Sequence, residues 1–195
     1  MFHLHLPGVL SLDQCRALIA VAEQRGFEAA TVNSYGEQKR VTNVRNNDRL
    51  EWDNPVLARE LEAQLQAAAG DAFPYLLEDQ VFAQTGSHFR MYRYRPGQYF
   101  KPHRDGHFEQ QELESFVTVL FYLNDTVGGE TILMPTSTQY RDNWITFAPR
   151  AGDVLLFQHD FWHEGRPVTA GEKYVLRSDL FYLSPAVPEG TLTVK

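Results

Sequence analysis

The chain has 195 residues, of which 43% are hydrophobic and 22% are charged, and its formal net charge is −7. This composition is that of an ordinary globular protein and excludes a disordered, collagen-like or coiled-coil chain. The acidic balance argues against binding to nucleic acid, because such binding uses clustered lysine and arginine side chains to neutralise phosphates. The length suits one domain with a sizeable core, and we expect residues 1–195 to form a single domain.

The cysteine content and the N-terminal residues bear on location. Cys15 is the only cysteine, so no disulfide can form within the chain. The N-terminus has no basic segment followed by a long apolar one, and no stretch reaches the ~20 apolar residues that cross a bilayer. We therefore expect a protein of a reducing compartment, the cytoplasm, that does not enter a membrane.

Two helices are predicted in the first part of the chain. Ser11 and Gln14 form the pattern of a capping box, and apolar residues at i, i+3, i+4 and i+7 follow them. Asn54 and Pro55 predict the start of a second helix, because asparagine caps helices and proline suits their first position. Gly70 would end that helix. Both helices have a single apolar stripe, which is typical of supporting elements.

The segment between these helices, residues 31–50, is rich in asparagine and arginine. It is either a solvated surface loop or a lid that contacts a substrate. We expect residues 1–79 to be a helical support with this loop, and residues 80–185 to be the core of the fold.

From about residue 80 the pattern changes to short strand-like runs separated by turn residues. The runs are 89–94, 116–123, 130–134, 144–147, 154–158 and 173–183. Many short strands at this spacing indicate a sandwich or barrel, and helices that precede the strands argue against alternating βαβ units. The sequence therefore predicts a mainly β fold with N-terminal helices, of the α+β class.

His103 and Asp105 could bind a metal together. On an extended backbone, residues two apart point to the same face, so an imidazole nitrogen and a carboxylate oxygen can reach one ion. His163, which follows an apolar strand 58 positions after Asp105, supplies a third candidate ligand. Two histidines and one carboxylate on one face are typical of non-heme Fe(II) oxygenases, although the same ligands suit manganese, cobalt or nickel. His159 competes with His163 for the third place.

The position of Lys173 favours His163 over His159 as the third metal ligand. It opens the last strand pattern ten residues after His163, and Arg177 shares its face by the strand period. A lysine that points into a barrel needs an anionic partner, because an unpaired buried ammonium is costly. The distal carboxylate of a 2-oxo diacid is such a partner.

The order of these residues resembles the Fe(II)/2-oxoglutarate-dependent dioxygenases, and within them the prolyl 4-hydroxylase-like branch. The resemblance covers about residues 80–185 and includes the 118–124 run and the 128–131 motif. It implies a double-stranded β-helix, or jelly roll, with Fe(II), 2-oxoglutarate and O2 as cofactors, and it allows ascorbate. It implies that Lys173 binds the distal carboxylate, with a supporting hydroxyl from Tyr122 and contacts from Tyr94 or Thr118. Arg177 goes beyond this pattern: it shares the face of Lys173, so it could either share the carboxylate or bind the substrate.

The substrate is less well indicated. The resemblance favours a prolyl residue in a peptide or protein, and a small molecule such as a free amino acid is the alternative. The predicted substrate contacts are Arg45, Asn46, Arg93 and Tyr99, with Arg40, Asn43 and Arg166 beside them. Two other readings stay open: a cupin-like metalloenzyme, which has no need of Lys173, and a noncatalytic sensor of 2-oxoglutarate.

Overall fold

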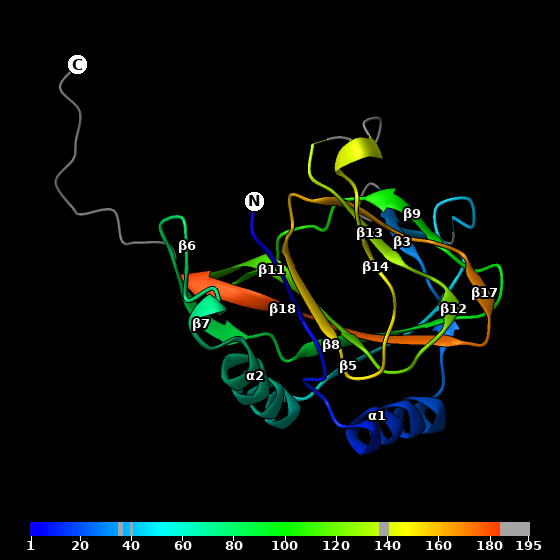
Figure 1. The fold of residues 1–195 in the computed structure, drawn as a ribbon, viewed down its shortest axis with the longest axis horizontal. Coiled ribbons are helices and arrows are strands. Elements are labelled where there is room, and N and C mark those ends of the chain that lie inside the picture. Colours follow the sequence, from blue (N-terminus) through cyan, green and yellow to red (C-terminus); the bar gives the residue numbers. More distant parts are fainter. Residues whose placement is uncertain (35–36, 40, 137–140, 184–195) are drawn as a thin grey trace, which may run out of the picture.

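The computed structural model describes residues 1–34, 37–39, 41–136 and 141–183. They form two main antiparallel sheets that face each other (Figure 1). Helices α1 (Leu12–Arg25) and α2 (Pro55–Ala69) cover the outer face of the larger sheet. Two short 3-10 helices, η1 (Gly70–Ala72) and η2 (Arg141–Asn143), complete the helical part. The predicted mainly β fold with N-terminal helices is confirmed.

The larger sheet has ten strands, in the order β1-β15-β11-β18-β8-β5-β2, with β6, β7 and β10 attached beside this path. Their bounds are β1 (His3–Leu6), β2 (Glu28–Ala29), β5 (Asp48–Asp53), β6 (Leu76–Leu77), β7 (Gln80–Thr85), β8 (His88–Tyr94), β10 (Glu109–Gln110), β11 (Leu113–Tyr122), β15 (Val154–Gln158) and β18 (Lys173–Leu183). The long strands β11 and β18 lie side by side at its centre.

The smaller sheet has four strands, in the order β14-β13-β16-β9. Their bounds are β9 (Phe100–His103), β13 (Thr131–Met134), β14 (Ile145–Phe147) and β16 (Trp162–Gly165). Two further pairs are β12 (Val127–Gly128) with β17 (Val168–Ala170), and β3 (Val32–Ser34) with β4 (Glu37–Lys39).

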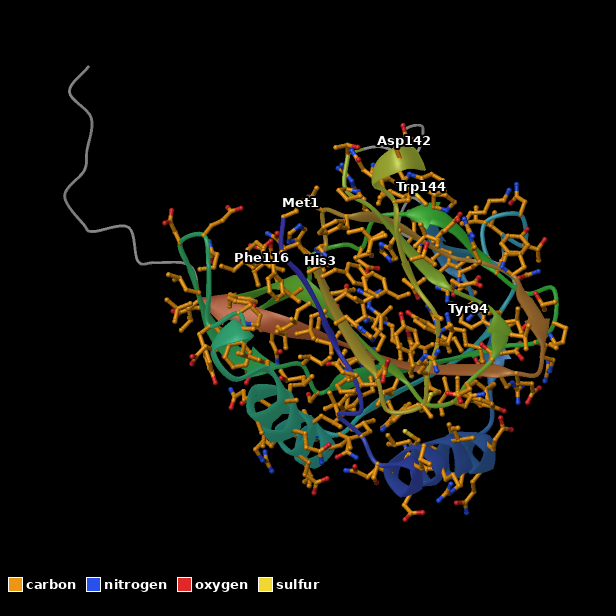
Figure 2. The ribbon with its side chains drawn as sticks, in the orientation of Figure 1. Met1, His3, Tyr94, Phe116, Asp142 and Trp144 are labelled. Atoms are coloured by element: carbon orange, nitrogen blue, oxygen red, sulfur yellow. The ribbon has the colours of Figure 1, made fainter. Side chains whose placement is uncertain are left out.

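The central strands are buried on both faces, so each strand alternates between two cores. On β11, Val119 and Phe121 pack toward the helices, whereas Leu120 and Tyr122 pack between the sheets. This alternation follows the two-residue period of a strand and explains why apolar residues at the end of β11 point to both faces. Side chains fill the space between the two sheets, and Tyr94 lies toward the end where β12 and β17 are found (Figure 2).

Both helices begin where the sequence predicts. The capping box of α1 is present, with Ser11 accepting from the Gln14 backbone N–H and Gln14 accepting from Ser11. Asn54 caps α2, and Leu61 and Leu65 of α2 are buried against the sheet. No helix in the described part of the chain is both long enough and apolar enough to cross a membrane.

The N-terminal third contributes more to the sheets than expected. Strand β1 pairs with β15 at one edge of the larger sheet, and β5 pairs with β8 near the other edge. The segment 31–50 is also not simply a solvated loop, because Arg45 and Asn47 are 4% and 1% exposed. Segment 41–49 therefore forms part of the wall around the interior.

Candidate active site

The three predicted metal ligands are brought together by the pairing of two strands. His103 ends β9, and it is the register partner of His163 on β16. Asp105 follows His103 by two residues and turns back to the same point. His103 Nε2 lies 3.9 Å from Asp105 Oδ1, and His163 Nε2 lies 3.5 Å from Asp105 Oδ2. One ligand atom from each residue lies within 4.8 Å of the others, so one ion can be held by all three.

Backbone carbonyls orient both imidazole rings. His103 Nδ1 donates to the Lys101 carbonyl at 2.8 Å, and His163 Nδ1 donates to the Phe161 carbonyl at 3.1 Å. The Nε2 atoms are then the unprotonated ones and face the shared point. Burial lowers the pKa of both histidines, so both rings are neutral near neutral pH and keep a lone pair for a metal.

Asp105 is held as a carboxylate. Burial alone would raise its pKa, but the Arg177 guanidinium, helped by the hydrogen bond from Thr118, holds that pKa well below its usual range. Arg177 Nη1 donates to Asp105 Oδ1 at 2.7 Å, and the Thr118 hydroxyl donates to Oδ2 at 2.6 Å. Two imidazole nitrogens and one carboxylate oxygen on one side of a point leave the opposite positions open. This donor set fits Fe(II) in a facial triad.

His159, the alternative ligand, lies outside this cluster. Its ring is buried, and its Nε2 is 3.3 Å from the carboxylate of Asp179. Among the residues that the structure describes, only His103, Asp105 and His163 meet the geometry of a three-ligand site.

A pocket between the sheets joins the triad to Lys173. We call it the inner pocket, and it is lined by His103, Asp105, His163, Lys173, Arg177, Tyr92, Tyr94, Phe100, Leu120, Thr131, Glu164, Gly165 and Val175. Lys173 is 3% exposed, and its Nζ donates to the Gly129 carbonyl at 2.6 Å. No carboxylate in the described residues pairs with it. Burial lowers its pKa to about 7, and the negative charge of Glu130 offsets only part of that effect.

Tyr94 and Tyr122 flank the lysine. Lys173 Nζ lies 5.3 Å from the Tyr94 ring centre and 5.5 Å from that of Tyr122. The Tyr122 hydroxyl donates to the hydroxyl of Thr131 at 2.8 Å. Thr131 lines the pocket and was missed by the sequence reasoning, although the 128–131 motif contains it. Gly129, in the same motif, lies against the lysine side chain. A Cβ added at Gly129 would lie 3.1 Å from Lys173 Cδ and 3.0 Å from Val168 Cγ2.

Thr118 and Arg177, which we considered as contacts of 2-oxoglutarate, both donate hydrogen bonds to the candidate metal ligand Asp105. Arg177 also donates to Asp179 Oδ1 at 2.9 Å, so it lies between two carboxylates. Arg177 still lines the inner pocket. The contacts of these two side chains with 2-oxoglutarate stay predictions.

The predicted substrate contacts divide into two groups. Arg45 lies against the wall of the site, and Asn46 fixes this segment by accepting from the Tyr99 backbone N–H at 2.8 Å. The Tyr99 hydroxyl donates to the Thr42 carbonyl. Arg93, in contrast, pairs with Glu23 and Asp48 away from both the triad and the inner pocket. Arg40 lies outside the described residues, and the substrate contacts of all these residues stay predictions.

The fold and site define a class of protein: two facing antiparallel sheets with a facial metal triad and a buried cation between them. The comparisons agree with that class. The family model of the 2OG-Fe(II) oxygenase superfamily matches residues 89–178. A relative in Acanthamoeba polyphaga mimivirus, whose name marks it as a candidate prolyl 4-hydroxylase, is 30% identical over 87% of this chain and 70% of its own length. The chain belongs to the 2OG-Fe(II) oxygenase superfamily and is an enzyme of the prolyl 4-hydroxylase-like type.

Solved structures support the fold. The viral collagen prolyl hydroxylase of Paramecium bursaria Chlorella virus-1, in complex with 2-oxoglutarate, matches with a TM-score of 0.65 at 18% identity, over 95% of this chain and 97% of that chain. A prolyl hydroxylase of Trichoplax adhaerens, solved with a peptide fragment of hypoxia inducible factor, matches with a TM-score of 0.68 at 17% identity, over 93% and 83%. The predicted jelly roll is confirmed.

Proposed function

We propose that this enzyme uses Fe(II), 2-oxoglutarate and O2 to hydroxylate an unactivated C–H bond of a prolyl residue in a peptide or protein. Succinate and CO2 are the expected by-products. The observation that carries the proposal is Lys173, a buried ammonium with no carboxylate partner in the described residues, in the same pocket as the triad. A cupin-like enzyme without a cosubstrate would have no use for this cation.

The side chains of the inner pocket have separate tasks. His103, Asp105 and His163 would hold Fe(II), and Arg177 and Thr118 keep Asp105 ionised and oriented. Lys173 binds the distal carboxylate of 2-oxoglutarate through a charge-assisted hydrogen bond. The hydrogen-bonded hydroxyls of Tyr122 and Thr131 lie beside Lys173 and can contact the same carboxylate. When bound, Fe(II) supplies the activation of dioxygen that is coupled to decarboxylation of the 2-oxo acid.

The pocket also excludes water from the reacting groups. Leu120 and Val175 line it from the larger sheet, and both are buried. In such a site the interaction of Lys173 with a carboxylate is stronger than in water. The same shielding orients the cosubstrate and protects the reaction from side products.

A hydroxylase of a small carboxylic acid, such as a free amino acid, is the second candidate. It is favoured by Arg45, a buried guanidinium on the wall of the site without a carboxylate partner in the described chain. A noncatalytic sensor would use the same residues. The single cysteine still predicts a cytoplasmic protein, and a role for ascorbate as a reductant is part of this proposal.

The test supplies purified protein under argon with Fe(II) and 2-oxoglutarate, then admits air with an amidated prolyl peptide or with free L-proline. Succinate and the hydroxylated product are measured together by mass spectrometry. Succinate with hydroxylated peptide supports the proposal, and succinate with hydroxylated free proline supports the second candidate. Binding of 2-oxoglutarate without any succinate would favour the sensor.

A further inference from the structure

A second hollow, which we call the outer groove, opens over the triad from the side of β5 and β8. Among the residues that the structure describes, its lining includes Arg45, Arg49, Arg90, Arg104 and Arg177 but only two carboxylates, Glu51 and Asp105. The whole chain carries 25 acidic against 18 basic residues, so this excess of arginine is opposite to the overall balance. A groove lined by one sign of charge concentrates ligands of the other sign.

Three of these arginines have carboxylate partners within the protein. Arg177 lies between Asp105 and Asp179. Arg49 and Arg90 share Glu51, with Nε to Oε1 distances of 3.2 and 3.3 Å. Arg45 and Arg104 have no carboxylate partner among the described residues, so their positive charge is available to a ligand.

Arg45 is the more telling of the two. It is 4% exposed, its Nε donates to Asn47 Oδ1 at 3.0 Å, and its Nη2 is buried without a hydrogen-bond partner in the described part of the chain. Burying such a donor costs free energy unless a ligand accepts its hydrogen bond. The guanidinium lies 4.1 Å from the ring centre of Phe100 and 4.9 Å from that of Tyr92.

The position of Arg45 relates it to the metal site. The Phe100 ring stacks on the imidazole of His103, with 3.5 Å between ring centres. One aromatic ring therefore connects the guanidinium to a metal ligand. Arg104 lies between His103 and Asp105 in the chain, is exposed, and has its guanidinium carbon 5.3 Å from the Trp162 ring centre. Both free cations thus flank the place where a substrate must approach.

We propose that the substrate carries a carboxylate, which Arg45 receives through Nη2 while Arg104 contributes at the rim. The inference rests on the proposed function and narrows its substrate class to prolyl peptides with a carboxylate near the target residue. The 2-oxoglutarate cosubstrate does not account for Arg45, because its distal carboxylate has Lys173 and Arg45 does not line the inner pocket. Either an acidic side chain or a free C-terminus could supply the carboxylate.

The experiment measures peptide affinity by isothermal titration calorimetry, with the enzyme loaded with Fe(II) and 2-oxoglutarate under argon. Four peptides are compared: acetyl-Ala-Glu-Pro-Glu-Ala-amide, its Gln counterpart, acetyl-Ala-Gln-Pro with a free C-terminus, and the acidic peptide with Ala in place of Pro. We expect at least one prolyl peptide with a carboxylate to bind about tenfold more tightly than the neutral amide, as a charge-assisted bond would give. Whichever peptide shows the gain identifies the source of the carboxylate.

Arginine variants test whether the outer groove causes this gain in affinity. Arg45→Gln should remove the preference, and Arg104→Glu should weaken binding of the carboxylate peptides more than that of the neutral one. Arg59→Gln, on the exposed face of α2, should leave all affinities unchanged. If Arg45→Gln does not fold, the Arg104 variant carries the test, because Arg104 is exposed and makes no ion pair with any residue that the structure describes.

The outcomes separate the inference from the proposed function. Equal affinity for all prolyl peptides, no binding of any peptide, or a preference that survives in both arginine variants would overturn the carboxylate proposal, even if succinate is formed. Tight, Arg45-dependent binding of the acidic peptide regardless of proline would uphold carboxylate recognition and contradict a prolyl substrate.

Discussion

Arg177 Nη1 donates to Oδ1 of Asp105 at 2.7 Å, and this bond ties the strand that carries Lys173 to a candidate metal ligand. The same guanidinium reaches Asp179 at 2.9 Å, and Asp179 lies 3.3 Å from His159. A chain of charged groups therefore extends from the metal site into β18. Its effect at the site is to fix the orientation and the charge of one carboxylate.

We expect Arg177→Gln to lower metal affinity about 10- to 100-fold, the usual effect of losing a residue that supports a metal ligand. The reason is that Asp105 loses its strongest partner and becomes free to rotate or to take up a proton. Calorimetric titration of the folded variant with Co(II) measures the change. Arg166→Gln, which changes an exposed arginine near the site, is the matched control. Equal Co(II) affinity in both variants would show that Arg177 does not position Asp105.

Lys173→Ala should weaken 2-oxoglutarate binding by about 10- to 100-fold while metal affinity stays near that of the unchanged protein. The variant removes the only ammonium in the described inner pocket but leaves the triad and its partners in place. Equilibrium binding of 2-oxoglutarate to the Co(II)-loaded protein is the measurement, and Lys101→Ala provides an exposed lysine as control. A loss of metal instead of cosubstrate would contradict the role given to Lys173.

The binding of 2-oxoglutarate should depend on pH through Lys173. Burial lowers its pKa to about 7, so above that pH the free protein holds a neutral amine and must take up a proton to bind the carboxylate. Affinity should then fall as pH rises above about 7, by about tenfold per unit at the limit. Lys173→Arg keeps its charge, so its affinity should not fall in this way. The affinity of the two proteins for 2-oxoglutarate is measured at several values from about pH 6 to about pH 9. Parallel pH profiles would exclude Lys173 as the cause of the dependence.

The same pKa affects folding with a definite sign. The folded pKa of Lys173 lies below its ordinary value of 10.5, so the folded protein binds fewer protons than the unfolded chain between the two values. This group therefore makes the ligand-free protein more stable as pH rises through that window. Lys173→Met should flatten the dependence of the free energy of unfolding on pH. Urea unfolding at several pH values checks this, and an unchanged dependence would contradict it.

His159, which follows β15, and His163, on β16, should respond differently to substitution. His163→Ala should abolish metal binding, because it removes one of three ligands. His159→Ala should retain metal, because His159 contacts Asp179 and lies outside the triad. Its cost should appear instead in thermal stability, since it opens a cavity and leaves a buried carboxylate with one partner fewer. Metal retained by His163→Ala and lost by His159→Ala would reverse the assignment.

Much of the site could be predicted because its candidate ligands lie in or just after strands. The His103-x-Asp105 spacing predicts that both side chains reach one point, and they do, although Asp105 follows the end of β9. The step from His163 to Lys173 places the cation in the same interior. The partner of Arg177 could not be predicted in this way. The strand period predicts which face of β18 carries Arg177. Its pairing with Asp105, however, depends on how β18 lies relative to the residues after β9.

The N-terminal strands could not be predicted from the sequence pattern either. Strand β1 has only four residues and its pairing with β15 is a contact across more than 140 positions, for which a single sequence carries no signal. Arg45 and Asn47 lie in a polar segment that is typical of a loop, yet both are buried. Phe100 and Tyr92 pack against the Arg45 guanidinium, and Asn47 accepts a hydrogen bond from Arg45 Nε. Local composition does not report such tertiary burial.

We propose that the triad and Lys173 together support dioxygenase chemistry on 2-oxoglutarate. The most direct test supplies isotopically heavy dioxygen to the Fe(II)-loaded protein with 2-oxoglutarate and a prolyl peptide. We predict that one heavy oxygen atom appears in succinate and one in the hydroxylated peptide, and that Asp105→Ala yields neither. Succinate without the heavy atom, or none at all from protein that binds both metal and 2-oxoglutarate, would contradict the account.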